Sequence, residues 1–176
     1  MRNLFFSISA TTRLARPGEI HAKHYYFYDK PTFETMLSEG GFLEHADYVG
    51  DYYGTPAKPV HEALEQGIDV LLELELVGAR KVKEKIPEAV MVFIAPPTLI
   101  ELERRLRGRG TDSEEKIQKR SVRAREEIRA VKEFDYVFVI PMLLVAVQDF
   151  KGVIRAERLR SSRLNSQDIA GFLKEL

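Results

Sequence analysis

Short apolar segments alternate with helical patterns along most of this chain, and this alternation limits the folds open to it. Four runs have the apolar and β-branched content of buried strands: "LFFSIS", "DVLLELEL", "AVMVFIA" and "YVFVI". Three of them are followed by segments with helical spacing of apolar residues. Strands that alternate with helices are typical of a parallel sheet covered by helices. The sequence therefore predicts an α/β protein.

The predicted helices are marked by apolar stripes and by residues that start helices. The helix from Leu99 has one apolar face, and the next opens at "TDSEE", where Thr111 or Asp112 can cap its first turn. The apolar stripe of that second helix is interrupted by a polar residue, Ser121. We expect the last helix to follow Pro141, because proline is tolerated in a first helical turn.

Composition excludes several classes of function. The chain has 176 residues and as many acidic as basic side chains, 27 of each, whereas a general nucleic-acid binder carries a basic excess. It contains no cysteine, which fits a reducing cytoplasm. Its longest apolar run, "VFVIPMLLVAV", has 11 residues and a proline, whereas a membrane-spanning helix needs roughly 20 residues. We expect a cytoplasmic protein that binds neither nucleic acid nor membrane.

The segment from residue 13 to residue 59 differs from the rest of the chain. It is rich in Tyr, Gly and Pro, with aromatic runs such as "HYYFYDK" and one amphipathic helical pattern, "TFETMLSEG". We expect it to be a small subdomain of short strands inserted into the α/β body.

Two arginines follow the first predicted strand and offer phosphate-binding chemistry. Arg13 and Arg16 lie three residues apart, just before the turn at Pro17 and Gly18. A guanidinium group presents a planar fork of donors that matches phosphate oxygens two at a time. The alternative is a pair of solvated surface arginines, which an isolated Arg-x-x-Arg motif does not exclude.

Four residues of the inserted segment have the chemistry to bind a guanine nucleotide. A buried carboxylate such as that of Glu44 accepts two parallel hydrogen bonds, which suits N1–H and the amine of guanine. Thr55 can donate to the guanine O6, and the hydroxyl of Tyr25 or Tyr53 can reach a phosphate. Taken singly, each of them is equally compatible with an ordinary packing or surface role.

Two glutamates and a group of arginines complete the candidates. Glu73 and Glu75 fall on one face of the predicted strand "DVLLELEL", where they could bind a base edge or hydrated Mg²⁺, or simply lie on an edge strand. The arginines of "RRLRGRG" and Arg120 suit a lid that stabilises a transferring phosphoryl group, although a solvated basic helix face is the simpler interpretation. The four histidines form no convincing metal site.

Taken together and in order, "SISATTRLARPGE", "HYYF", "GFLEHADYVGDYYGTP", "VLLELELVGAR", "FIAPP" and "ERRLRGRGTDSEE" resemble the guanylate kinase family, which transfers a phosphoryl group from ATP to GMP. The resemblance implies a parallel sheet of the nucleoside-monophosphate kinase (P-loop NTPase) type and Mg²⁺ bound with ATP. It implies a core of residues 1–12 and 60–176, a lid at about 104–125 and a GMP-binding subdomain at 13–59. The residues it implies for the GMP phosphate are Arg13, Arg16, Tyr25 and Tyr53. Those implied for the rest of the GMP pocket are Ser9, Glu44, Thr55 and Glu75, and those for the lid and transferred phosphate are Arg105, Arg109 and Arg120.

The departures from the family pattern concern the ATP half. No glycine in the 176 residues begins the Gly-x-x-x-x-Gly-Lys loop that cradles ATP phosphates, so the first strand and loop of the family are missing from this sequence. Glu75 replaces a usual Asp, Val77 a usual Gln, and Ile140-Pro141-Met142 stand where the family has Asn-Asp. We expect an incomplete sheet with exposed apolar faces, which could borrow a strand in a homodimer, and impaired kinase activity. The alternatives are a non-catalytic GMP-binding or protein-interaction module, and a fragment without a function of its own.

Overall fold

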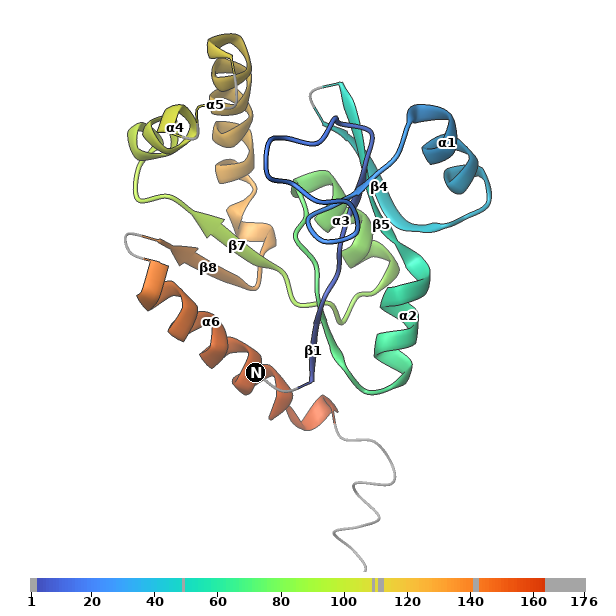
Figure 1. Ribbon diagram of the computed structural model, residues 1–176. Helices are drawn as coiled ribbons and strands as arrows, with labels where there is room; N and C mark the ends of the chain where they lie inside the picture. Colours follow the sequence, from blue (N-terminus) through green and yellow to red (C-terminus); the bar gives the residue numbers. More distant parts are fainter. Residues whose placement is uncertain (1–2, 49, 109, 111–112, 141–142, 164–176) are drawn as a thin grey trace, which may run out of the picture.

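The computed structural model describes residues 3–48, 50–108, 110, 113–140 and 143–163. Two of its sheets are parallel pairs: β1 (Leu4–Phe6) with β6 (Asp69–Leu71), and β7 (Val92–Ala95) with β8 (Tyr136–Val139). Each pair is joined through intervening helices, as Figure 1 shows. The predicted α/β class with parallel strands is therefore confirmed.

The third sheet has four strands in the order β3-β2-β5-β4. β3 (Tyr26–Phe27) lies parallel to β2 (Ala10–Thr11), and β5 (Asp51–Pro56) is antiparallel to both β2 and β4 (Phe42–Tyr48). Most of this sheet comes from the segment expected to be an inserted subdomain, and β2 precedes that segment. The division of the chain into domains stays a prediction.

Six α-helices connect and cover the strands of the described residues: α1 (Lys30–Ser38), α2 (Ala57–Glu65), α3 (Leu76–Lys85), α4 (Leu99–Gly108), α5 (Glu114–Arg129) and α6 (Leu143–Arg158). Short 3₁₀ turns are found at Val131–Glu133 and Ser161–Arg163. The predicted cap of α5 is wrong: Ser113 occupies the N-cap, where its Oγ accepts from the Lys116 N–H at 3.4 Å. Thr111 and Asp112 lie outside the described residues.

Two clusters of buried residues lie on opposite sides of β4. Phe42 packs with Phe33 of α1, ring centroids 4.4 Å apart, while the next residue, Leu43, packs with Val60 of α2 and Val82 of α3. Neighbouring strand residues point to opposite faces, so a step of one residue places them in different clusters. β4 thus holds α1 on one side and α2 and α3 on the other, and this fixes the side chains that β4 and β5 present.

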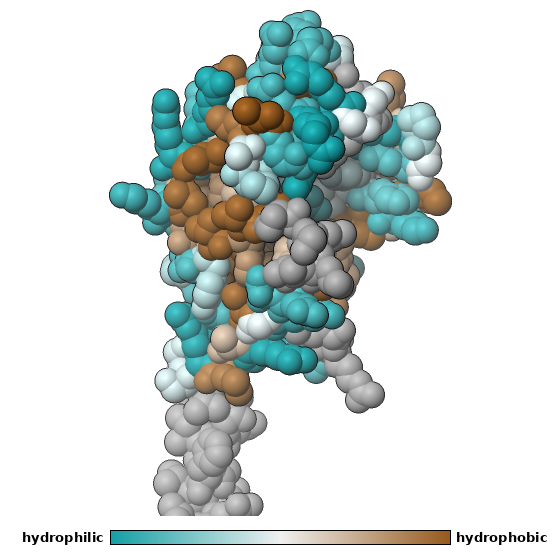
Figure 2. Space-filling model, turned by 90° about the vertical axis from the view of Figure 1, so that its left-hand side faces the viewer, coloured by the Kyte–Doolittle hydropathy of each residue, from teal (hydrophilic) through white to brown (hydrophobic). Residues whose placement is uncertain are grey.

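The β7–β8 pair is only partly covered, and apolar side chains remain exposed on both of its faces, among them Ile94, which is 58 % exposed. Phe138 packs against Phe150 of α6, with ring centroids 5.8 Å apart, whereas Val137 and Val139 remain 48 % and 56 % exposed. Figure 2 shows apolar side chains gathered on the face of the molecule that carries these elements. Parallel strands are normally covered on both faces. The predicted exposure of apolar strand faces is confirmed.

Helix α6 also reaches the other parallel pair. Near its end, the Arg158 guanidinium donates to Asp69 Oδ2 at 2.5 Å and to the Asn3 carbonyl oxygen at 2.9 Å. Side-chain contacts therefore tie α6 to the start of β1 and β6, while no backbone ladder among the described strands joins one pair to the other. No helix in the described part of the chain is long and apolar enough to cross a membrane.

Candidate functional site

A buried carboxyl group lies at the centre of the site. Glu44 on β4 is 5 % exposed and faces Thr55 on β5, whose Oγ1 donates to Glu44 Oε1 at 2.7 Å. Gly78 leaves room for this carboxyl, because a Cβ built there would lie 2.7 Å from Glu44 Oε2. Burial raises the pKa of Glu44, and the nearby Glu75 charge raises it further, against the lowering effect of Thr55 and of Lys81. Sequence reasoning grouped Glu44 with Thr55, and the structure places them in contact.

Glu73 and Glu75 do not share a strand face, because β6 ends at Leu71 and the expectation of a longer strand is wrong. Glu75 is instead the N-cap of α3, where its Oε1 accepts from the Gly78 N–H at 3.0 Å. Its other oxygen, Oε2, accepts from the Arg123 guanidinium of α5. Glu73 lies in the connection between β6 and α3 and is exposed. The two carboxylates therefore have separate surroundings.

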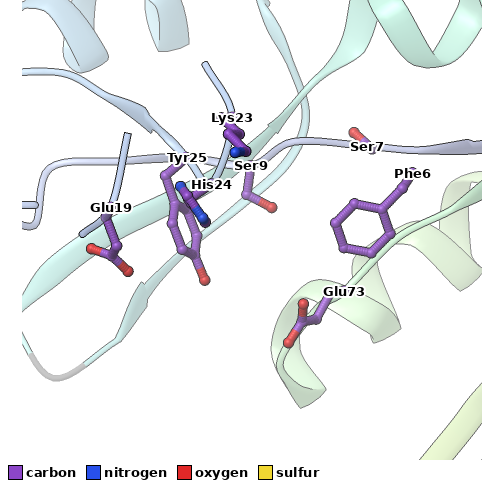
Figure 3. Close-up of a pocket in the computed structure, with 8 residues that line it drawn as sticks. All are labelled: Phe6, Ser7, Ser9, Glu19, Lys23, His24, Tyr25 and Glu73. Atoms are coloured by element: carbon purple, nitrogen blue, oxygen red, sulfur yellow. The ribbon is translucent and has the colours of Figure 1, made fainter. Parts of the chain in front are cut away.

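A cleft of about 260 Å³ lies between the end of β1 and the loop that carries Glu19 and Tyr25. In Figure 3, Ser9 and Tyr25 approach it from one side, while Phe6 and Glu73 approach it from the other. Burial is the main cause that raises the pKa of Tyr25, so its hydroxyl stays protonated and able to donate. The lining residues are Phe6, Ser7, Ser9, Glu19, Lys23, His24, Tyr25 and Glu73.

The two arginines of the Arg-x-x-Arg motif are organised by one glutamate. Arg13 Nη2 donates to Glu19 Oε1 at 2.9 Å, and the backbone N–H of Arg16 donates to Glu19 Oε2 at 2.7 Å. The Arg13 guanidinium also lies 5.5 Å from the Tyr25 ring centroid and 5.7 Å from that of Phe27. The hydrogen bond from Arg13 is the main cause that lowers the pKa of Glu19. Arg13 is therefore held in place rather than free on the surface.

A second, smaller pocket brings helix α5 to these arginines. Arg120 lies beside Tyr48, its guanidinium carbon 5.7 Å from the ring centroid, and Tyr48 and Tyr53 are in ring contact at 6.1 Å. Four cationic side chains and two tyrosines therefore converge, a set that suits an anion with several oxygens. The pocket is lined by Arg13, Arg16, Tyr48, Asp51, Tyr53, Lys116 and Arg120.

Of the two remaining predicted arginines, the structure describes only Arg105, which does not line this pocket. Arg105 of α4 donates to Glu101 Oε1 at 2.7 Å and to the Ile140 carbonyl oxygen at 3.0 Å. It thereby joins α4 to the end of β8 and lines neither pocket described above. Arg109 lies outside the described residues. The phosphate-facing role of both residues stays a prediction.

Sequence reasoning did not single out Glu19, Tyr48, Lys116 or Arg123, all of which contribute to the site. A signal for two of them was present on the second predicted lid helix, because side chains spaced by four and three share a helix face. Lys116, Arg120 and Arg123 have this spacing. Glu19 and Tyr48 carry no comparable signal, since loop and hairpin-end positions acquire their neighbours only in the fold.

Comparisons with known proteins agree with this arrangement. The family model described as "Guanylate kinase" matches residues 2–157. A "Guanylate kinase" of Thermus thermophilus is 56 % identical over 161 residues, which cover 92 % of this chain and 73 % of that protein. The one from Carboxydothermus hydrogenoformans is 53 % identical over 163 residues, 93 % of this chain and 80 % of that protein.

A solved structure shows the same fold. The crystal structure of guanylate kinase from Anaplasma phagocytophilum superposes with a TM-score of 0.80 and 34 % sequence identity, over 90 % of this chain and 78 % of that one. The chain belongs to the guanylate kinase family. The predicted family and the nucleoside-monophosphate kinase type of fold are confirmed.

Proposed function

We propose that this protein binds GMP and that its chemistry is that of a guanylate kinase, the transfer of a phosphoryl group from ATP to GMP to give ADP and GDP. The observation that carries the proposal is the pairing of two sites. A buried carboxyl–hydroxyl pair, Glu44 with Thr55, lies on the same two strands, β4 and β5, as the tyrosines of the cationic pocket lined by Arg13 and Arg120. The relatives named guanylate kinase support the same activity.

Different residues bind the base and the phosphate of GMP. Glu44 accepts hydrogen bonds from the N1–H and amine of guanine, and Thr55 donates to the base. Arg13 and Arg16, with Tyr25 and Tyr53, hold the GMP phosphate. Ser9 lines the cleft, and Glu75, which lines neither pocket, is assigned to the GMP pocket by the family resemblance alone. Arg120 faces the phosphate from α5, where it neutralises the charge that develops during in-line transfer. Catalysis of this kind depends on positioning and charge rather than on a covalent step.

We propose Mg²⁺ as the cofactor, bound together with ATP. Mg²⁺ takes oxygen ligands and usually keeps several waters, so one or two carboxylates suffice beside the phosphates. Glu73 fits this requirement because it is exposed and lines the cleft. Glu75 does not fit, because both of its oxygens already accept hydrogen bonds. When bound, the ion would neutralise phosphate charge beside Glu73.

We propose that phosphoryl transfer by these 176 residues is impaired, although GMP binding is retained. Support comes from the sequence, which contains no Gly-x-x-x-x-Gly-Lys loop, and from Ile140-Pro141-Met142 in place of Asn-Asp. Residues 141 and 142 lie outside the described residues. Retained GMP binding is supported by the pocket that Arg13, Arg16 and Tyr53 line and by the contact of Thr55 with Glu44. We further propose that the protein acts in the cytoplasm, and that a homodimer could complete its sheet.

The test is a calorimetric titration of GMP into the purified chain. We expect saturable binding that Arg13→Ala and Glu44→Gln each abolish or weaken strongly, because one loses a phosphate ligand and the other a base acceptor. Arg125→Ala serves as the control, since Arg125 is an exposed residue of α5 that lines neither pocket.

Three other outcomes of the titration would lead to different conclusions. A folded protein that does not bind GMP would refute the proposal and favour an interaction module. An unfolded protein would indicate a fragment. Binding that persists unchanged in both Arg13→Ala and Glu44→Gln would show that GMP binds elsewhere.

A further inference from the structure

Arg123 of α5 makes contacts that the proposed binding of GMP does not require. The Arg123 guanidinium donates to Glu75 Oε2, and its central carbon lies 4.5 Å from the ring centroid of Tyr48. Its Nε also lies 3.7 Å from Glu127 Oε1, one helical turn further along α5. Two carboxylates and an aromatic face therefore surround this one side chain.

These contacts join three elements that are distant in the sequence. Glu75 is the N-cap of α3, Tyr48 ends β4, and Arg123 lies near the middle of α5. The Arg123 and Glu75 side chains are only 29 % and 17 % exposed, so solvent screens their attraction less than that of a fully exposed pair. Guanidinium groups are suited to this position because they can pair with a carboxylate and stack on a ring at the same time.

The position of Arg123 bears directly on Arg120. The two residues are three apart on α5 and share a helix face, and both guanidinium groups lie over the ring of Tyr48. Anchoring Arg123 therefore fixes the rotation of α5 and its distance from the phosphate pocket that Arg120 lines. Glu75 in turn accepts from the Gly78 N–H, so a second contact orients the carboxylate that pairs with Arg123.

We propose that Arg123 is a positioning residue. Its contacts with Glu75 and Tyr48, here called the clasp, hold α5 in place and so keep Arg120 at the phosphate pocket before any nucleotide binds. The proposal rests on the proposed function only for the identity of the ligand; the clasp itself is a contact between parts of this chain. Loss of the Arg123 side chain would leave the contact of Arg120 with Tyr48 but would break the ion pair that ties α5 to α3.

The first measurement is a distance between α5 and the sheet that carries Tyr48. The chain contains no cysteine, so Glu34→Cys on α1 and Gln118→Cys on α5, both exposed, allow a pair of spin labels to be attached. Electron–electron double resonance without nucleotide should give a narrow distance distribution in the labelled parent. Arg123→Gln should broaden it, and Arg125→Gln, an exposed arginine of the same helix, should leave it unchanged.

The second measurement is GMP affinity by calorimetry in the same proteins. We expect Arg123→Gln to weaken GMP binding about tenfold, as the loss of a partly buried ion pair and a cation–π contact implies. Arg123→Lys, which keeps the charge but not the planar fork, should fall between the parent and Arg123→Gln in both measurements.

The outcomes separate the clasp from the proposed function. A narrow distribution in Arg123→Gln would overturn the clasp. A broadened distribution with unchanged GMP affinity would overturn the positioning role. A distribution that responds to Arg123→Gln in a protein whose parent does not bind GMP would support the clasp while refuting the proposed function.

Discussion

Glu44 shows how much of this site depends on single residues. Its carboxyl is buried, hydrogen-bonded to Thr55 and adjacent to Gly78, where any side chain would meet it. Ionising a carboxyl group with so little solvent around it costs free energy unless hydrogen-bond donors surround it. The protein supplies one close hydroxyl donor from Thr55, whereas bound guanine would supply two further N–H groups. The residue is therefore better satisfied with its proposed ligand than without it.

The raised pKa of Glu44 leads to a prediction about pH. Because the folded pKa lies above the ordinary value of 4.5, the folded protein holds a proton that the unfolded chain releases first. This group's contribution to stability is therefore fully present below pH 4.5 and falls as pH rises toward the raised pKa. Over the same range GMP affinity should increase, because guanine requires the carboxylate form.

The measurement compares the parent with Glu44→Gln in chemical denaturation and GMP titration at a series of pH values. Glu44→Gln should gain stability relative to the parent as pH rises above 4.5, by about 1.4 kcal/mol for each unit by which the folded pKa is raised. The ratio of the parent's GMP affinity to that of Glu44→Gln should rise with pH, because the phosphate of GMP titrates alike in both proteins. Parallel stability curves for the two proteins would contradict the prediction.

At the scale of an element, helix α5 is held by polar contacts as well as by apolar packing. Its predicted apolar stripe is only partly buried: Ile117 is in the core, whereas Ile128 is 38 % exposed. The polar residue of the stripe, Ser121, is buried, and its Oγ has no hydrogen-bond partner among the described residues. The contacts of Arg120 and Arg123 also hold the helix, so polar contacts replace part of the usual apolar packing.

Ser121→Ala should therefore stabilise the protein. The substitution removes a buried hydroxyl without a partner in the described part of the chain and introduces a better helix former, which together contribute about 1 kcal/mol to the free energy of unfolding. Ser113→Ala is the matched control on the same helix, because it removes the N-cap and should destabilise by about 1 kcal/mol. Denaturant unfolding of both variants measures the difference. A destabilised Ser121→Ala protein would show that this hydroxyl has a partner after all.

The sequence predicted the elements better than their ends. Alternating apolar runs were sufficient to find the strands of the two parallel pairs, whereas β3, β4 and β5 were expected only as a subdomain of short strands and helix α2 was not predicted. Motif order was sufficient to group Arg13, Glu44 and Thr55. Glu75 was misplaced because strand alternation continues through it, while the helix that begins at Leu76 needs a capping acceptor just before it. Glu19 could not be predicted, since its pairing with Arg13 depends on the loop that folds between them.

At the scale of the whole molecule, the sheets differ in how many strands are paired among the described residues. The sheet that carries Glu44 has four joined strands, whereas β1–β6 and β7–β8 are separate pairs among the described residues, with exposed apolar faces. Edges and faces of this kind are usually paired or covered. The sheet that would serve GMP therefore has four paired strands while the two parallel pairs are left open, although Val70 of β6 packs in the same cluster as Leu43 of β4.

This difference in strand pairing predicts GMP binding without efficient turnover. In a coupled assay with ATP, Mg²⁺ and GMP, the chain should turn over well below about 1 s⁻¹, the lower end of the usual kinase range. The Thermus thermophilus guanylate kinase, 56 % identical, provides the positive control under the same conditions. Turnover within the usual range would contradict the proposed impairment.

The contact between Arg13 and Glu19 gives the proposed phosphate pocket an internal counter-ion. A phosphate that enters must compete with a carboxylate already present on Arg13, so binding there exchanges one anion for another. A singly charged ion such as chloride gains little from that exchange, because it replaces one negative charge by one. A phosphate dianion gains more, since it brings a second charge and several acceptor oxygens to the neighbouring cations. Under the proposed function, Glu19 would therefore favour multiply charged ligands over the salt of the surrounding solution.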